Sequence, residues 1–157
     1  MRTQKVFVLL ATLVAALGLS WGLGAANGAG SASAHDSARY RVVFEVNDPA
    51  GTDNANWVGV LNNVSNSLDE LGEENMQVEV VAHGPGINLL NKAKSPVELQ
   101  ARIAELQDRG VVFAACANSM AKNGYTMEDM VDGAVQVPSG AAEVIRKQQE
   151  GWLYMHS

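Results

Sequence analysis

The sequence predicts a single α/β domain, a three-layer α/β/α arrangement around a mainly parallel sheet of about five strands. Two observations predict it: short apolar runs alternate with segments of helical periodicity, and three of the runs follow a glycine directly, at Gly110, Gly133 and Gly151. Glycine adopts a left-handed backbone without a Cβ clash, so it can end a helix and let the next strand begin. This alternation of helix and strand is typical of α/β folds.

The expected strands are the apolar runs themselves. They are 40–46 (YRVVFEV), 78–82 (VEVVA), 111–115 (VVFAA), 134–137 (AVQV) and 152–155 (WLYM). The run 111–115 has no polar alternation, which predicts a strand that is covered by helices on both faces.

The first expected helix, 53–71, is predicted by apolar residues that advance by four, three, four and three positions, with Gly72 as the C-cap. The stripe consists of Trp57, Leu61, Val64, Leu68 and Leu71.

The second expected helix opens with the letters SPVE, in which Ser95 is the N-cap, Pro96 the first helical residue and Glu98 the partner in a capping box. Its residues Leu99, Ile103 and Leu106 would face the sheet. A shorter third helix is expected near Thr126. A fourth is expected from about Ser139 to Glu150, with Val144 and Ile145 buried.

Residues 1–34 predict a secretory signal peptide. Arg2 and Lys5 precede an uncharged apolar run, and small residues at Ala32 and Ala34 form a cleavage site. We expect cleavage after Ala34 and export of residues 35–157 to the periplasm, with no membrane association afterwards. The alternative is an uncleaved membrane anchor, although its Gly- and Asn-containing part would fill a bilayer poorly.

Charge and cysteine content exclude several classes of function. Beyond residue 34 the chain carries 9 basic and 17 acidic residues, a net charge of −8, and no Lys/Arg cluster, which argues against nucleic acid as a partner. Cys116 is the only cysteine, so it cannot form a disulfide within its own chain. Without a second cysteine or histidines at ligand spacing, structural zinc is excluded, and we expect no cofactor.

Polar residues follow three of the expected strands, and ligands of parallel sheets bind beyond the carboxyl ends of the strands. These segments are 47–51, 83–88 and 116–124. A helical turn that begins at about Ala117 would point free backbone N–H groups at the sulfur of Cys116, lower its pKa and favour the nucleophilic thiolate. The alternative is that Cys116 is a small buried hydrophobic residue.

The stretch GVVFAACANSMAKNGYTMEDM resembles the DsrE/DsrF-like family of small sulfur-relay proteins, in which a strand runs into a cysteine at the head of a short helix. The stretches VVAHGPGINLL and QQEGWLYM are similar to an uncharacterised branch of that family. The resemblance covers residues 40–155. It implies that Cys116 carries sulfur as a persulfide, that the chain forms trimers or hexamers, and that its partners are sulfur donor and acceptor proteins or small sulfane-sulfur compounds.

The chemistry of the residues near the expected strand ends suggests roles for them beside Cys116. His83 would accept a proton from the thiol or hydrogen-bond the persulfide, or else it is a turn residue that bonds the following Gly-Pro-Gly backbone. A bound anion or persulfide would be held by a further set of residues: Asn47, Asn88, Ala117, Asn118 and Ser119. The three asparagines are explained equally well as turn formers.

Other functions stay open beside a sulfur carrier or sulfurtransferase. One is an exported, non-catalytic binding module that recognises a small sulfur compound or a protein. Another is a structural oligomer whose cysteine is inert. Met120, Met127 and Met130 are soft ligands that suit copper, but methionine commonly fills gaps in a core instead.

Overall fold

The computed structural model describes residues 38–156, so the expected signal peptide lies outside the described residues. The strands are β1 (Tyr40–Val46), β2 (Met76–Ala82), β3 (Val112–Cys116), β4 (Val135–Val137) and β5 (Leu153–His156). The α-helices are α1 (Ala55–Leu71), α2 (Val97–Asp108), α3 (Ala117–Asn123) and α4 (Gly140–Gln149). Short 3-10 helices are η2 (Thr52–Asn54), η3 (Glu73–Asn75), η4 (Gly84–Leu89) and η5 (Met127–Asp129).

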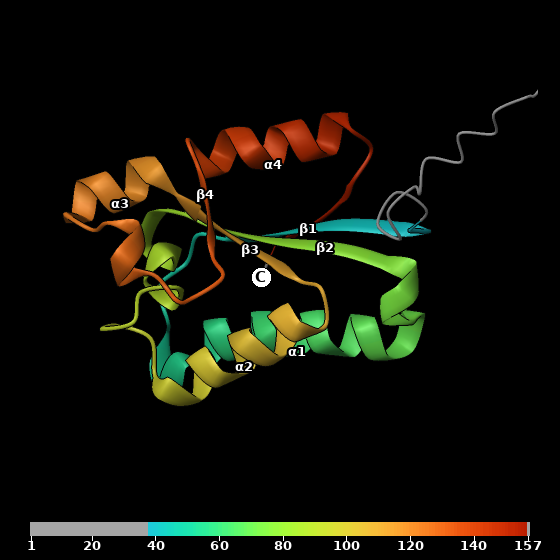
Figure 1. Ribbon diagram of the computed structural model, residues 1–157, viewed down its shortest axis with the longest axis horizontal. Helices are drawn as coiled ribbons and strands as arrows, with labels where there is room; N and C mark the ends of the chain where they lie inside the picture. The colour runs from blue at the N-terminus through green and yellow to red at the C-terminus, as the bar shows by residue number, and fades with distance from the viewer. Residues whose placement is uncertain (1–37, 157) are drawn as a thin grey trace, which may run out of the picture. The chain divides into compact units, whose positions relative to one another are not determined.

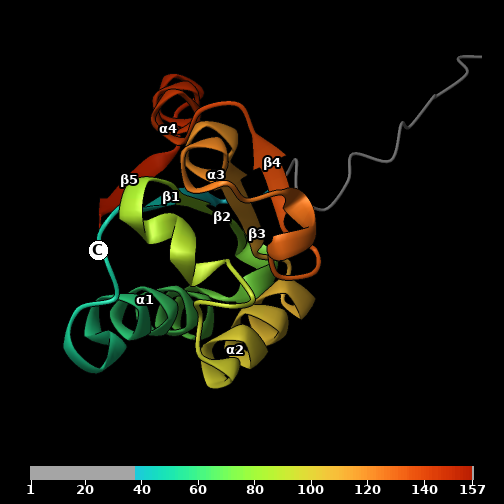
Figure 2. The ribbon, with the colours of Figure 1, turned by 90° about the vertical axis from the view of Figure 1, so that its left-hand side faces the viewer.

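The five strands form one sheet in the order β4-β3-β2-β1-β5, and every neighbouring pair is parallel. Helices α1 and α2 cover one face, and α3 and α4 lie on the other (Figures 1 and 2). The three-layer α/β/α fold with a parallel five-stranded sheet is therefore confirmed. All strands point the same way, so their carboxyl ends meet at the edge that faces the viewer in Figure 2.

Each face of the sheet has its own hydrophobic cluster, because side chains alternate along a strand. In β1, Val42, Phe44 and Val46 belong to the larger cluster, which includes the buried residues of α1 and α2. Val43 belongs to the smaller cluster, which includes Val144 of α4. The centre of the sheet is thus buried on both sides, as its continuous apolar runs predict, whereas the edge strand β5 is exposed.

Helix α1 matches the expected stripe over most of its length. Its buried side chains include Trp57, Leu61, Val64 and Leu68, and each contributes about 1.5–3 kcal/mol by leaving water. Gly72 is the C-cap, and its N–H bonds the carbonyl of Leu68. The last expected member of the stripe, Leu71, is 38% exposed at the end of the helix.

The start of α2 differs from the expectation. Pro96 is the N-cap, with an extended backbone (φ −55°, ψ 145°), and the helix begins at Val97 without a side-chain cap. The backbone N–H of Ser95 instead bonds the carbonyl of Asn91, which places Ser95 in the preceding turn. The predicted capping box of Ser95 and Glu98 is therefore wrong.

Two other expectations are corrected by the fold. Instead of a helix near Thr126, a single 3-10 turn, η5, follows it, because Met130 then bridges to Asn91 and draws the chain into an extended path. In α4, Val144 is buried as expected, but Ile145 is 57% exposed because the next residue on a helix points away from the sheet.

Candidate functional site

The strand register brings His83 and Cys116 together. Ala82 of β2 pairs with Ala115 of β3, and the two strands are parallel. The residues that follow them in the chain, His83 and Cys116, are therefore neighbours. His83 and Cys116 lie two residues after Val81 and Ala114, so their side chains point to the same face of the sheet. Val81 and Ala114 belong to the hydrophobic cluster under α4. The two residues therefore point toward α4 at the carboxyl edge of the sheet. The two residues lie at the same edge because β2 and β3 are neighbours in the sheet, and the sequence does not give this strand order.

Cys116 ends β3 and is the N-cap of α3, which begins at Ala117 as expected. The residue is 4% exposed, yet it belongs to neither hydrophobic cluster. Burial raises the pKa of its thiol, but hydrogen bonds from Ser119 and from backbone N–H groups outweigh this effect, so the pKa lies below its ordinary value. The backbone donors belong to Gly140, Ser119 and Asn118. A buried sulfur that is surrounded by donors favours the thiolate.

The Ser119 hydroxyl connects two parts of the site. Its oxygen accepts a hydrogen bond from the backbone N–H of Gly84, at 2.8 Å. Because that oxygen already accepts from Gly84, its own hydrogen is available to the sulfur of Cys116, in agreement with the lowered pKa of the thiol. The loop after β2 therefore orients the side chain that supports the sulfur.

The first residue of α4, Gly140, approaches the same place from above the sheet. Ser139 is the N-cap of α4, and its hydroxyl accepts from the N–H of Ala142. A Cβ on Gly140 would lie 2.6 Å from the Cβ of His83, closer than real contacts allow. Glycine is thus what lets the start of α4 reach His83 and direct an N–H toward Cys116.

We expect Gly140→Ala to raise the pKa of the Cys116 thiol toward that of free cysteine. The added methyl group collides with His83, so the start of α4 must move. The backbone N–H of residue 140 then no longer donates a hydrogen bond to the sulfur of Cys116. Thiolate ultraviolet absorbance, followed against pH, measures the shift. Gly59→Ala is the matched control, since within residues 38–156 a Cβ there meets no atom within 4 Å beyond its chain neighbours and its own helix backbone. An unchanged titration in the Gly140 variant would contradict the assigned role of this N–H.

His83 bonds a carboxylate of β1. Its Nε2 lies 2.7 Å from Oε1 of Glu45, and the hydroxyl of Tyr154 donates to the other carboxylate oxygen. Burial raises the pKa of Glu45, but the bonds from Tyr154 and His83 bring it below its ordinary value. The same contact raises the pKa of Tyr154 to about 12. Because an ionised carboxylate only accepts hydrogen bonds, Nε2 of His83 is the donor in this contact, and Nδ1 is the ring nitrogen left for other partners.

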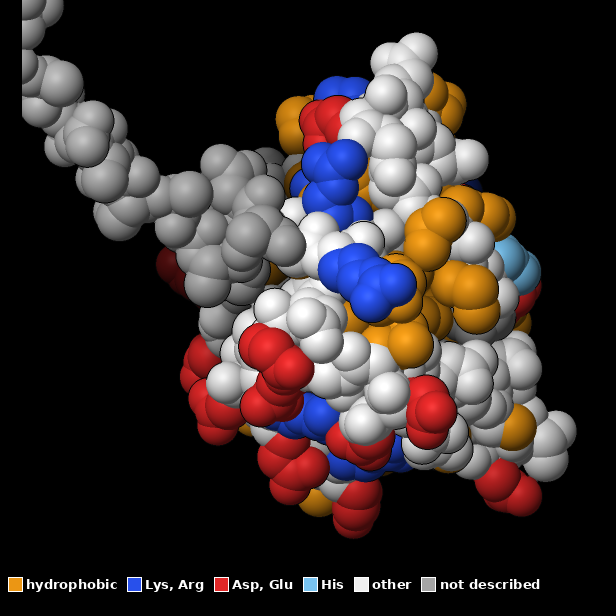
Figure 3. Space-filling view, turned by 90° about the vertical axis from the view of Figure 1, so that its right-hand side faces the viewer, with side chains coloured by type: hydrophobic (Ala, Val, Ile, Leu, Met, Phe, Trp, Pro, Cys, Tyr) orange, Lys and Arg blue, Asp and Glu red, His pale blue; other side chains and the backbone are white. Residues whose placement is uncertain are grey.

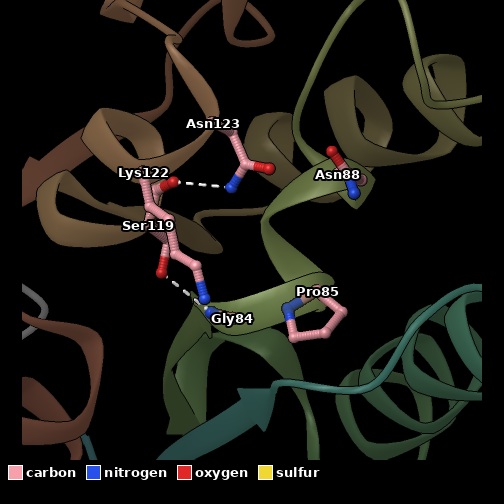
Figure 4. A pocket seen from close by; sticks show the side chains of 6 residues that line it. All are labelled: Gly84, Pro85, Asn88, Ser119, Lys122 and Asn123. Atoms are coloured by element: carbon pink, nitrogen blue, oxygen red, sulfur yellow. Dashed lines mark hydrogen bonds between the residues drawn. The ribbon is translucent and has the colours of Figure 1, made fainter.

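A pocket of about 250 Å³ opens between η4 and α3 (Figure 4). Its lining residues are Gly84, Pro85, Asn88, Ser119, Lys122 and Asn123. Cys116 itself is not among them, and Ser119 is the side chain that contacts both the pocket and the sulfur.

The residues expected at the site separate into two groups. Asn88 and Ser119 line the pocket, and the N–H of Asn118 acts on the sulfur at the helix start that Ala117 forms. Asn47 does not line the pocket, and its side-chain oxygen lies 3.4 Å from Nε2 of His156. Sequence reasoning missed Glu45 and Gly140. The Ser-Gly pair after β4 is a helix-start signal that points to Gly140, whereas nothing local points to Glu45.

Two general properties of the described residues bear on function. Within residues 38–156, no group of three or more His, Cys, Asp or Glu side chains is placed to hold a metal ion. Met120 and Met130 are buried in the larger hydrophobic cluster. None of the helices in this part of the chain has both the length and the apolar character needed to cross a bilayer.

The model of the DsrE/DsrF-like family matches residues 31–156. The chain belongs to this family. Its fold is shared by the protein of unknown function MTH1491 from Methanobacterium thermoautotrophicum, with 32% identity and a TM-score of 0.67 over 75% of this chain and 99% of the other. No curated protein matches the chain.

Two further solved structures share the fold at lower identity, 13% each. The ychN protein from E. coli has a TM-score of 0.57, with 75% of this chain and 99% of the other covered. The conserved protein of unknown function BT1422 from Bacteroides thetaiotaomicron has a TM-score of 0.56, with 77% and 97% covered. These two similarities concern the fold alone, whereas the family match suggests a sulfur-relay type of protein.

Proposed function

We propose that the protein carries sulfane sulfur as a persulfide on Cys116. The observation that carries the proposal is the set of hydrogen-bond donors around the buried sulfur, which lowers the thiol pKa and favours the nucleophilic form. The same donors would stabilise the negative charge of a persulfide, which is an anion at neutral pH. Family membership supports the proposal, since it suggests a sulfur-relay type.

The proposed chemistry needs few groups. The Cys116 thiolate attacks the outer sulfur of a donor, and the electron pair of the broken bond leaves with the rest of the donor. His83, through Nδ1, would remove the proton from any thiol that enters with the acceptor, while Glu45 holds its ring in place. An acceptor thiolate then takes the outer sulfur and regenerates the Cys116 thiolate.

The test is the mass of the protein after incubation with a sulfane-sulfur donor under anaerobic conditions. We expect a gain of one sulfur atom in the native protein, reversed by excess thiol, and no gain in Cys116→Ser. Ser119→Ala is the informative partner variant: it keeps the thiol but removes one donor from the sulfur, so loading should become slower without being abolished. If the native protein gains no sulfur from any donor, the persulfide proposal fails.

A second candidate function is a binding module that uses the same rim without covalent chemistry. The observation in its favour is that Cys116 is only 4% exposed and does not line the pocket. This function predicts ligand binding that survives Cys116→Ala and no persulfide at any stage. Ligand binding and sulfur mass, measured on the same variants, separate the two functions.

Assembly and location are part of the proposal. We propose a homo-oligomer, a trimer or hexamer, in which the edge strand β5 takes part, because Leu153, Tyr154 and Met155 are exposed on it. Hydrophobic side chains gather in the middle and toward the right of the face in Figure 3, and most acidic side chains lie in its lower part. Native mass spectrometry of the same samples reports the number of subunits, and a monomer at micromolar concentration would refute the assembly.

We further propose export to the periplasm, on the pattern of residues 1–34. An oxidising compartment threatens a reactive thiol, because exposed thiolates are readily oxidised. The 4% exposure of Cys116 reduces this difficulty, since little of the sulfur is open to oxidants in solution. The N-terminal residue of protein purified from its native compartment tests this, and an intact Met1 would contradict cleavage.

A further inference from the structure

The pocket between η4 and α3 has a chemical character that differs from that of the chain as a whole. None of its six lining residues is acidic, although acidic residues outnumber basic ones by 17 to 11 in the sequence. Its only charged lining residue is Lys122. A cavity with one cation and no carboxylate favours a small anion over a neutral or cationic ligand.

Two hydrogen-bond donors are available on opposite walls of this pocket. Lys122 forms no salt bridge with any residue in the range 38–156. The side-chain oxygen of Asn88 accepts from the hydroxyl of Tyr125 at 2.9 Å, which leaves the amide NH₂ as a donor. Figure 4 shows the Lys122 side chain running along one wall toward Gly84, with Asn88 on the other wall. An ammonium group and an amide N–H are donors that suit oxyanions.

The remaining polar groups of the pocket are engaged and fix its shape. The side-chain nitrogen of Asn123 donates to the carbonyl of Ser119 at 2.7 Å, and the N–H of Gly84 donates to the Ser119 hydroxyl. Ser119 also bonds the sulfur of Cys116. Ser119 therefore borders both this pocket and the reactive sulfur, and a donor anchored in the pocket would have to extend past this one side chain to reach Cys116.

We propose that this pocket binds the oxyanion group of a small sulfane-sulfur donor, with Lys122 as its principal anchor. The inference rests on the proposed persulfide at Cys116 and names the class of its donor: a small anion that carries a sulfonate-type or carboxylate group, rather than a protein. The cavity of about 250 Å³ lies just below the usual range for drug-sized ligands, so it suits a small anion and has no room for a folded partner.

The transfer balances without an added oxidant or reductant. The Cys116 thiolate forms a bond to the outer sulfur of the donor, and the bond between that sulfur and the rest of the donor breaks. The electron pair leaves as a sulfinate or sulfite from a thiosulfonate-type donor, or as a thiolate from a persulfide donor. One negative charge stays on the new persulfide, and the leaving group carries the charge that the donor brought.

Binding is tested without the chemistry, in the full-length Cys116→Ser variant. Thiosulfate is the probe for a sulfonate-type group and acetate the probe for a carboxylate, and NMR follows the backbone amides of Gly84 and Asn88. We expect saturable binding of at least one probe. Adding Lys122→Met should weaken that binding about tenfold or more, because a charged hydrogen bond is lost. Lys94→Met removes the same charge from an exposed position outside the pocket, and we expect it to change nothing.

Sulfur loading of the protein with Cys116 present separates this inference from the persulfide itself. We expect Lys122→Met to raise the KM for the preferred small donor about tenfold and to leave the maximal rate nearly unchanged. If no probe binds, or if both lysine variants behave alike, the subsite is wrong, even where Cys116 loads from a persulfidated protein. If probes bind as expected but Cys116 never gains sulfur, the subsite stands and the persulfide proposal fails.

Discussion

Lys147→Ala is expected to lower the free energy of unfolding by about 3 kcal/mol, because it leaves a carboxylate buried without its partner. The ammonium of Lys147 lies 2.6 Å from the carboxylate of Glu79, in the central strand β2, where the Glu79 side chain is 8% exposed. The same ammonium lies 4.2 Å from the centre of the Trp152 ring. Urea denaturation of the variant and the native protein measures the difference.

The loss of unfolding free energy caused by Lys147→Ala should grow as the pH rises. Burial raises the pKa of Glu79, and Lys147 acts against that effect, so the pKa rises further when the lysine is removed. The folded state then holds a proton that the unfolded state has already lost, and stability falls with increasing pH above the ordinary range of a glutamate, about 4.3. A deficit that is equal at pH 5 and pH 8 would contradict this account.

Two matched variants test whether burial is the cause. Lys92→Ala breaks an ion pair of similar length, 2.8 Å, with an Asp132 side chain that is 97% exposed, and it should cost at most about 0.5 kcal/mol. The double change Lys147→Met with Glu79→Leu removes both charges together, and we expect stability close to that of the native protein. If Lys147→Ala and the double change are equally destabilising, the cause is lost packing and not the unpaired charge of the buried Glu79 carboxylate.

Gly86→Ala is expected to destabilise the protein by about 3 kcal/mol or more, as a severe case of overpacking. A Cβ at this buried position would lie 2.2 Å from the carbonyl oxygen of Val46 and 2.6 Å from its carbonyl carbon. These are backbone atoms of β1 and cannot rotate away as a side chain would. Thermal and urea unfolding measure the loss, and a deficit below about 1 kcal/mol would show that η4 moves freely from β1.

The control for Gly86 is another glycine replaced by the same residue. Gly59 lies inside α1, and among the described residues a Cβ built there meets no atom within 4 Å beyond its chain neighbours and its own helix backbone. Alanine has the higher helix propensity, so Gly59→Ala should stabilise the protein by about 0.5–1 kcal/mol. Opposite signs for one substitution at two positions would show that space around the residue determines the result.

The sequence predicts the fold well because its main signals are local. Alternation of apolar runs and helical stripes is read within a short window, and it yields all five strands and the helices α1, α2 and α4. The errors also have local causes. Ser95 and Pro96 satisfy the pattern of a helix start, but the bond from the Ser95 N–H to Asn91 places Ser95 in a turn.

The candidate site is predicted only in part, because it is assembled by the strand order. Cys116 at a strand end and the helix start at Ala117 are neighbours in sequence, so the pattern predicts both. Glu45 reaches His83 across 38 positions, and Gly140 reaches the same histidine across a larger gap. Such contacts depend on the pairing of β1 with β2 and on the path of α4, and neither is encoded in any single stretch of the chain.

The path of α4 has a consequence for the order in which the site matures. This helix leaves the β4 edge, packs on β3, β2 and β1, and returns the chain to β5 at the opposite edge. During synthesis residue 140 emerges after the cysteine, so the thiol acquires one of its donors only when this late segment has docked. A chain in which this segment has not docked thus lacks one of these donors, so the full lowering of the Cys116 pKa belongs to the completed fold.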